Sequence, residues 1–77
     1  MNVKIISPDT TQYEGPAKLL QLPGTDGLFE LLHGHAPIIA ALKEGRIRIL
    51  NEEGEMTFQI RAGVVRAQNN EVLVLIQ

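Results

Sequence analysis

The chain has 77 residues, with seven Lys and Arg against nine Asp and Glu, which gives a formal net charge of −2. This length fits one small domain that buries only about 60% of its unfolded surface, and the lack of Cys leaves no disulfide to support it. The weak charge offers no clustered cationic face for nucleic acid, and no run approaches the roughly 18 apolar residues of a membrane span. The N-terminus also lacks the apolar core of a signal peptide, so we expect a cytosolic location.

Short strands separated by turns are predicted in the first half of the chain. Residues 3–7 form a strand that Pro8-Asp9 ends. A longer strand is expected over residues 12–22, and because it contains Gly15-Pro16 it suits an edge or a bulge better than the centre of a sheet. Residues 22–49 are dense in Gly and Pro, which predicts a shaped surface loop.

Residues 38–44 are ambiguous within that stretch. Ala, Leu, Lys and Glu favour a helix, and the following Gly45 is a typical helix C-cap. The segment is too short for a stable isolated helix, so we expect a strand or a single turn.

Two hairpins are predicted in the second half. Residues 46–49 and 56–60 alternate between apolar and polar side chains, as in strands with one buried face, and residues 51–54 supply a polar turn with Gly54. Asn69-Asn70 supplies a second turn, between residues 63–68 and 71–76. The fold class that follows is all-β, with short antiparallel strands in a single domain over residues 1–77.

The last predicted strand, residues 72–76, is apolar on both faces. Such a strand lies at the centre of a sheet or is covered by something outside the domain. Its outward residues, such as Leu73 or Leu75, are therefore candidates for a partner contact.

Residue patterns that suggest chemistry are weak. His33 and His35 would point the same way in an extended segment, but a third metal ligand is missing, so we expect hydrogen-bonded histidines, with His35 the structural one. The glycines of residues 24–27 lack the Lys-Ser/Thr of a phosphate-binding loop and are interpreted as a turn. No cofactor is predicted.

Catalytic and nucleic-acid functions also lack support. Ser7, Thr10 and Thr11 have Asp9 nearby but no oriented base, and turn or capping roles explain them. An oligonucleotide-binding face would combine outward arginines with stacking aromatics, and the aromatics are too few. The arginines considered for one outward sheet face are Arg46, Arg48, Arg61 and Arg66; a solvated or partner-facing surface is favoured for them.

Leu28 and Phe29 lie at the tip of the Gly-rich turn, where a large apolar side chain is costly to expose. Alternation predicts that Phe29 points inward and Leu28 outward. An apolar residue on a turn tip often marks a contact surface.

The order and spacing of these elements resemble the N-terminal β-sandwich of the epsilon subunit of F-type ATP synthases over essentially the whole chain. The motifs that carry the resemblance are Val3-Lys-Ile-Ile-Ser-Pro8, Gly15, Gly24-Thr-Asp-Gly27, Gly34-His-Ala-Pro37, Gly45-Arg-Ile-Arg-Ile49, Gly63 and Val72-Leu-Val74. Each is a common turn or strand, but the set is specific.

The resemblance implies a non-catalytic rotor subunit that joins the gamma subunit of the central stalk to the membrane-embedded c-ring and couples ion-driven rotation to ATP synthesis. It places the subunit at the cytoplasmic face of the bacterial membrane, held there only through the complex. The implied c-ring contact is Asp26, Gly27 and Leu28. The implied gamma contact comprises His35, Ala36, Pro37 and Ile38, to which we add Leu73 and Leu75.

The chain departs from the family pattern at Leu28, where relatives often carry Glu, and at Glu30, where they often carry Gly. Many relatives also continue into a C-terminal two-helix hairpin that restrains hydrolysis and in some cases binds ATP, and we expect a chain that stops at Gln77 to do neither. The alternative function is a small β-barrel module that binds a peptide or an oligonucleotide.

Overall fold

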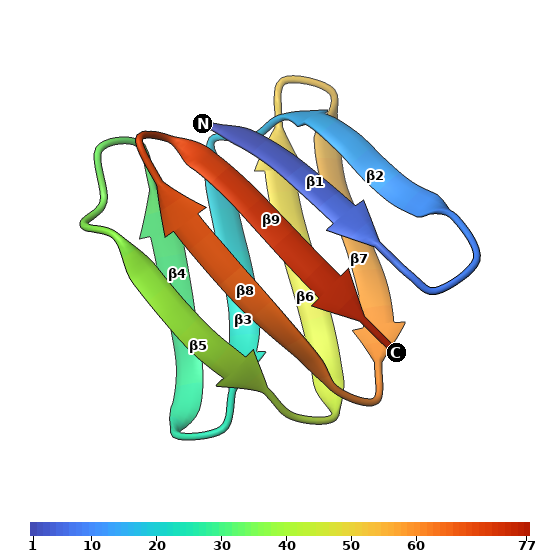
Figure 1. The fold of residues 1–77 in the computed structure, drawn as a ribbon. Coiled ribbons are helices and arrows are strands. Elements are labelled where there is room, and N and C mark those ends of the chain that lie inside the picture. Colours follow the sequence, from blue (N-terminus) through green and yellow to red (C-terminus); the bar gives the residue numbers. More distant parts are fainter.

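The computed structural model describes residues 1–77 as nine strands joined by short turns (Figure 1). The chain contains no helix that could cross a membrane. The strands are β1 (Asn2–Ile6), β2 (Thr11–Pro16), β3 (Leu19–Gly24), β4 (Gly27–Leu32), β5 (Ile38–Leu42), β6 (Gly45–Asn51), β7 (Gly54–Ile60), β8 (Gly63–Gln68) and β9 (Glu71–Ile76).

One continuous sheet folds over itself to make two layers. Its strand order is β2-β1-β9-β8-β5-β3-β6-β7, with β4 paired to β3. Strands β5 and β3 share only the pair Gly24–Leu42, and there the sheet turns from the front layer (β2, β1, β9, β8, β5) to the rear layer (β4, β3, β6, β7) (Figure 1). The all-β sandwich prediction is confirmed. One pair departs from the antiparallel pattern, because β1 and β9 run parallel.

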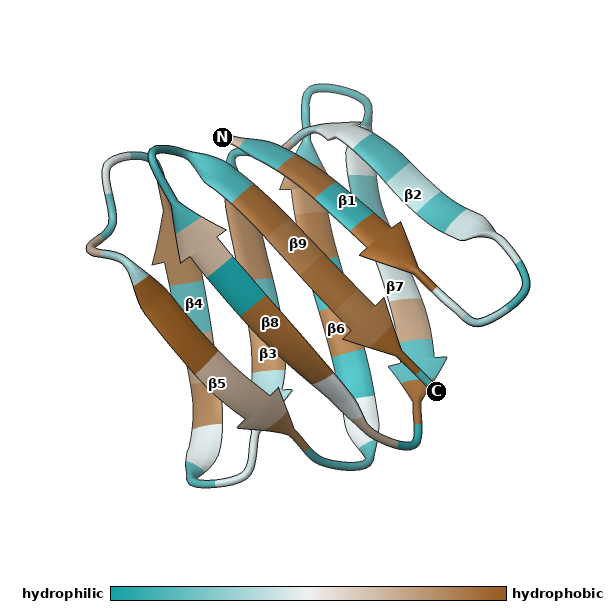
Figure 2. Cartoon of the chain, in the orientation of Figure 1, coloured by the Kyte–Doolittle hydropathy of each residue, from teal (hydrophilic) through white to brown (hydrophobic).

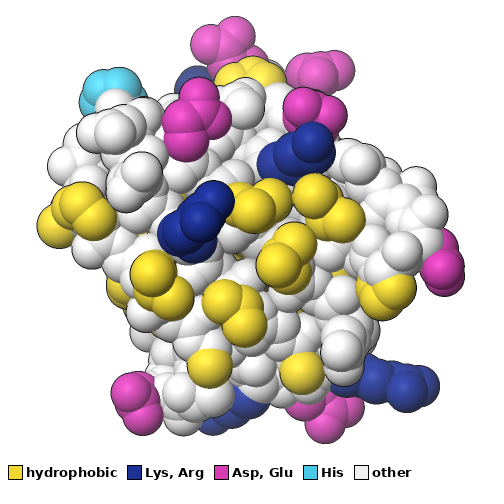
Figure 3. Space-filling model, viewed as in Figure 1, with side chains coloured by type: hydrophobic (Ala, Val, Ile, Leu, Met, Phe, Trp, Pro, Cys, Tyr) yellow, Lys and Arg dark blue, Asp and Glu magenta, His cyan; other side chains and the backbone are white.

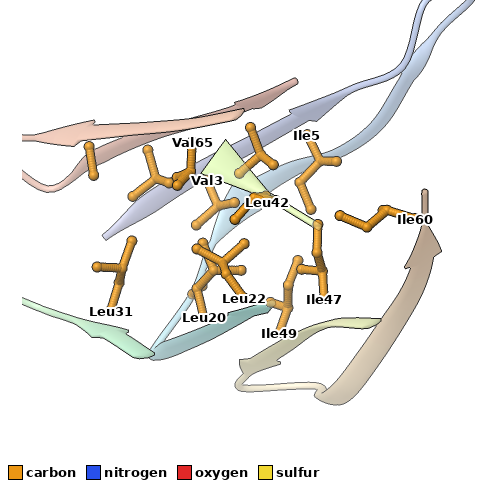
Figure 4. Close-up of a cluster of buried hydrophobic side chains, with 14 residues drawn as sticks. Val3, Ile5, Leu20, Leu22, Leu31, Leu42, Ile47, Ile49, Ile60 and Val65 are labelled. Carbon is orange, nitrogen blue, oxygen red and sulfur yellow. The ribbon is translucent and has the colours of Figure 1, made fainter. Parts of the chain in front are cut away.

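The core lies between the two layers and is entirely apolar. Fourteen hydrophobic residues form it, and no polar or charged residue is buried. Figure 2 shows hydrophilic and hydrophobic residues alternating along strands such as β1 and β6, and Figure 4 shows the inward side chains of both layers converging, among them Val3, Ile5, Leu20, Leu22 and Ile47. The period of two in a strand therefore sends one set of side chains into a shared interior.

The two ends of the strand order, β2 in the front layer and β7 in the rear layer, meet through an aromatic pair. The ring of Tyr13 on β2 meets the ring of Phe58 on β7 edge-on, with ring centroids 6.4 Å apart. The Tyr13 hydroxyl donates to the carbonyl of Pro16 at 2.6 Å and accepts from Asn51 Nδ2 at 3.1 Å. Hydrogen bonds thus satisfy the polar end of the ring while its apolar body covers the core.

Both hairpins of the second half are confirmed. Strand β6 pairs with β7, and β8 pairs with β9 through a two-residue turn in which Asn69 and Asn70 have φ of 53° and 59°. Positive φ at both positions is what a type I′ turn needs, and Asn tolerates it. Strand β9 lies between β1 and β8, so the prediction of a central strand is confirmed. Residues 38–42 are a strand, as expected.

Three predictions from the sequence are wrong. The strand expected over residues 12–22 breaks at Ala17-Lys18, because the Ala17 amide donates to Met1 in the front layer and the Lys18 amide donates to Leu50 in the rear layer. Residues 22–49 are mostly strand rather than loop, since Gly24, Gly27 and Gly45 lie at strand ends and only Gly34 lies in a turn. Met56, on the predicted buried face of residues 56–60, is 43% exposed, because β7 is the last strand of its layer. The edge position of β2 was predicted correctly.

Gly24 lies where the sheet folds over, and the structure predicts that it tolerates no side chain. A Cβ there would lie 2.8 Å from both the carbonyl oxygen of Gly27 and Cε1 of Phe29. We expect Gly24→Ala to lower the free energy of unfolding by about 1–3 kcal/mol through overpacking, measured by urea denaturation.

Gly15→Ala is the matched control, because its Cβ would meet nothing closer than the Tyr13 hydroxyl at 3.6 Å. We expect it to leave stability unchanged or to raise it by about 0.4–1 kcal/mol. Equal stability of the two variants would contradict the close approach described at Gly24.

Candidate functional site

The outward side of the front layer carries a group of exposed apolar side chains. Ile39 on β5 is 75% exposed, Val64 on β8 is 46% exposed and Leu75 on β9 is 48% exposed. Figure 3 shows hydrophobic side chains gathered over these strands. We call this surface the front face and define it by the outward residues of four adjacent strands: Ile39, Ala41, Val64, Arg66, Leu73, Leu75, Lys4 and Ile6.

Strand register arranges the front face in two rows. The first row is apolar throughout and runs across the layer through Ala41, Val64, Leu75 and Ile6. The second row runs through Ile39, Arg66, Leu73 and Lys4, so that its basic residues alternate with apolar ones. Neighbours in a row belong to strands about 4.8 Å apart, so the face forms a continuous surface.

The predicted gamma-contact residues lie in two places that adjoin each other. Leu73 and Leu75 point outward on the front face, with Leu73 partly buried and Leu75 exposed. Ile38, the first residue of β5, is partly buried and packs against the core, whereas the next residue, Ile39, is the exposed one. Ile39 and Val64 were not among the predicted contact residues, although alternation within residues 38–42 and 63–68 could have identified both.

The remaining predicted gamma-contact residues, His35, Ala36 and Pro37, form the loop between β4 and β5. The Gly34 amide donates to Asn70 Oδ1 at 2.7 Å, and the carbonyl of Asn70 accepts from the Asn2 amide at 2.8 Å. One turn residue therefore holds the loop and the first strand together. The loop stands at the end of the sandwich where β8 and β9 are joined (Figure 1).

His35 is held within this loop, as the sequence predicted. Its amide donates to the carbonyl of Leu32 at 3.1 Å, and its Nδ1 lies 2.8 Å from the carbonyl oxygen of Ala36, which can only accept, so Nδ1 carries the proton in this contact. Nε2 is buried without a hydrogen-bond partner. His33 is exposed, and the structure gathers no three His, Cys, Asp or Glu side chains in a geometry that could hold a metal.

The predicted c-ring contact, Asp26 to Leu28, lies at the tip of the β3–β4 hairpin: Asp26 is in the two-residue turn, and Gly27 and Leu28 begin β4. We call this tip the turn with Leu28. Leu28 is 68% exposed and Phe29 packs against the core, so both predicted orientations are confirmed. The turn is braced against the end of β5: the Thr25 amide donates to the Ala41 carbonyl at 3.1 Å, and the Lys43 amide donates to the Pro23 carbonyl at 2.9 Å.

The turn with Leu28 and the loop with His35 lie at opposite ends of β5. Strand β5 begins directly after the loop and ends at Leu42, which pairs with Gly24 beside the turn. Its five residues span about 13 Å at about 3.3 Å per residue. The two predicted contact regions are therefore separate surfaces joined by one strand.

The arginines do not share a face. Arg66 lies on the front face, whereas Arg46 and Arg48 lie on the outward side of β6 in the rear layer. Arg48 Nε donates to Glu55 Oε1 at 2.8 Å, and this hydrogen bond, together with the charge of Glu55, raises the pKa of Arg48 above its usual value. The chain thus has no single arginine surface of the kind that an oligonucleotide-binding face needs.

The family described as "ATP synthase, Delta/Epsilon chain, beta-sandwich domain" matches residues 1–77. An ATP synthase epsilon chain of Chlorobium limicola is 38% identical over 72 residues, which cover 92% of this chain and 82% of that protein. One from Synechococcus sp. (strain PCC 6716) is 37% identical over 76 residues, which cover 99% of this chain but only 55% of the relative.

Solved structures share the fold at low sequence identity. A chain in the Euglena gracilis mitochondrial ATP synthase OSCP/F1/c-ring structure superimposes with a TM-score of 0.88 at 17% identity, over 96% of this chain and 48% of that one. A chain in the central stalk/c-ring structure of Tetrahymena thermophila mitochondrial ATP synthase gives a TM-score of 0.83 at 13% identity. The match covers 100% of this chain and 63% of that one. At these identities the likeness concerns the fold alone.

The anchoring of the His35 loop by Asn70 is testable with Asn70→Gly. Glycine keeps the positive φ that the turn needs, and its lack of a side chain removes the hydrogen bond from the Gly34 amide to Oδ1. We expect amide hydrogen exchange at Gly34 to become about tenfold faster, as the loss of one ordinary hydrogen bond would give.

Asn69→Gly is the control, since Asn69 also has positive φ but makes no such bond to the loop. Exchange at Gly34 should be unchanged in this variant. The same acceleration in both variants would show that turn flexibility, and not the Asn70 side chain, governs the loop.

Proposed function

Because this chain belongs to the β-sandwich family of ATP synthase delta/epsilon chains, we propose that it is a non-catalytic central-stalk subunit that links gamma to the c-ring. In this role it rotates with both partners and transmits ion-driven rotation toward ATP synthesis without making or breaking bonds itself. The complex would hold it at the cytoplasmic face of a bacterial membrane as a peripheral component. The observation that carries the proposal is the family match over residues 1–77, joined to the exposed apolar front face.

The front face supports the assignment of a gamma-binding surface. Contiguous exposed apolar side chains on a small protein commonly mark a protein contact, and the cores of such interfaces are depleted in charge. The first row of the front face fits this description, because Ala41, Val64, Leu75 and Ile6 are all apolar. The loop with Pro37 borders the same face and would extend the contact.

The turn with Leu28 supports the assignment of a ring-binding surface. It projects Asp26 and a 68% exposed Leu28 from one end of the sandwich, at the bottom of Figure 1. Backbone hydrogen bonds from Thr25 and Lys43 tie the turn to its surroundings. In this chain the contact would combine one carboxylate with one apolar side chain.

The arrangement suits a part that transmits torque. Both proposed contact surfaces are attached to β5, which is hydrogen-bonded along its length to β8 and at its end to β3. A force applied at the turn passes through backbone hydrogen bonds and a close-packed core to the front face, without a flexible linker in between. Rigidity of this kind couples two partners mechanically.

The gamma contact is tested by Leu75→Asp. A charge placed in the apolar row would be desolvated by a partner but remains solvated in the free chain, where Leu75 is 48% exposed. We expect affinity for the gamma subunit of the same ATP synthase to fall about tenfold or more, measured by titration calorimetry.

Leu32→Asp is the matched control, because Leu32 is 51% exposed on β4 in the rear layer. It should bind gamma normally, and both variants should unfold at similar urea concentrations. If Leu75→Asp bound gamma as well as the original chain does, the front face would not be the gamma-binding surface.

The ring contact is tested by single-cysteine cross-linking, which the chain permits because it has no Cys of its own. Leu28→Cys in the assembled complex should cross-link to a cysteine placed in a polar loop of the c-ring. Glu53→Cys, in the turn between β6 and β7, should not, because Figure 1 places that turn at the opposite end of the sandwich. Cross-links from Glu53→Cys alone would reverse the proposed orientation.

A further inference from the structure

Arg66 lies on the front face between the apolar first row and the polar pair Gln68 and Glu71. In the second row of the front face its cross-strand neighbours are Ile39 on β5 and Leu73 on β9. A partner that covers both neighbours must also cover the guanidinium between them, because adjacent strands are only about 4.8 Å apart. A partner that contacts Ile39 and Leu73 therefore also removes water from Arg66.

The guanidinium has no partner inside the chain. The ion pair within 4.0 Å that the structure contains joins Arg48 and Glu55 in the rear layer. Glu71, diagonal to Arg66 across the β8–β9 hairpin, accepts instead from Asn2 Nδ2 at 3.4 Å. The other basic residue of the row, Lys4, differs from Arg66 because its cross-strand neighbour on β2 is Glu14.

Arg66 also lines two hollows of about 320 Å³ each. One lies toward β9 and β1 and includes Leu73, Lys4 and Glu71 in its lining. The other lies toward β5 and includes Ile39 and Pro37. Figure 3 shows basic side chains standing among hydrophobic ones on this face. A side chain of a covering protein can therefore reach the guanidinium from either side.

Covering an unpaired cation removes its water and is strongly unfavourable unless the covering surface supplies a charged acceptor. Arginine presents a planar fork of donors that matches a carboxylate through two parallel hydrogen bonds. We infer that the gamma surface docked on the front face carries an Asp or Glu that pairs with Arg66. This inference rests on the proposed function and adds a charge requirement to a contact otherwise formed by apolar residues.

The test measures binding of gamma to the whole chain with Arg66→Met, which keeps an unbranched apolar stem but removes the guanidinium and its charge. We expect affinity to fall about tenfold or more, because the gamma carboxylate loses its partner. The remaining affinity should also depend less on salt between roughly 50 and 500 mM, a range that spans the Debye length of about 10 Å at 0.1 M. Arg66→Lys should give an intermediate affinity, since it keeps the charge and loses the fork.

Arg46→Met is the control for loss of an exposed arginine elsewhere, because Arg46 lies on the outward side of β6 in the rear layer. It should leave affinity and salt dependence unchanged. Unchanged or tighter binding by Arg66→Met, alongside weak binding by Leu75→Asp, would overturn the inference and leave the gamma contact standing. Normal binding by both variants would overturn the gamma assignment of the front face and the inference with it.

Discussion

The packing of two sheet layers against one apolar interior is the interaction on which the rest of this structure depends. Fourteen hydrophobic residues form that interior, with no buried polar group and no disulfide among them. Every strand contributes alternate side chains to the core or borders it, so the outward positions follow once the inward ones are fixed. The front face exists because β5, β8 and β9 bury Leu42, Val65 and Val74 on their other side.

The packing of two layers also explains the position of β5 at the passage between them. The sheet passes from one layer to the other between β5 and β3, through one register pair and the backbone bonds around it. Gly24 is part of that passage, and its lack of a side chain lets Phe29 and the Gly27 carbonyl approach. The strand that closes the sandwich therefore also separates the turn with Leu28 from the loop with His35. In the proposed rotor role, β5 would be a rigid spacer between the two proposed contacts.

The charged side chains on the two outward faces of the sandwich have different neighbours. On the rear layer Arg48 pairs with Glu55, and Gln21 Nε2 donates to Glu30 Oε2 at 3.1 Å, so polar groups satisfy one another across the strands. Exposed pairs of this kind add little stability. Arg46, on the same layer, has no ion pair, but its cross-strand neighbour is the polar Gln59. On the front face Arg66 stands unpaired among apolar neighbours. This contrast is a physical reason to assign binding to the front layer.

The sequence by itself determined the local elements of this protein. Alternation identified both C-terminal hairpins, Asn69-Asn70 identified a turn with positive φ, and the tip was assigned correctly, with Leu28 outward and Phe29 inward. These features depend on neighbours along the chain, which a sequence displays directly. Tertiary structure decided what depends on distant segments: the break at residues 17–18, the parallel pairing of β1 with β9, and the exposure of Met56 at a layer edge. It also placed Ile39, Arg66 and Leu73 in one row, because strand register and not sequence spacing sets which side chains meet.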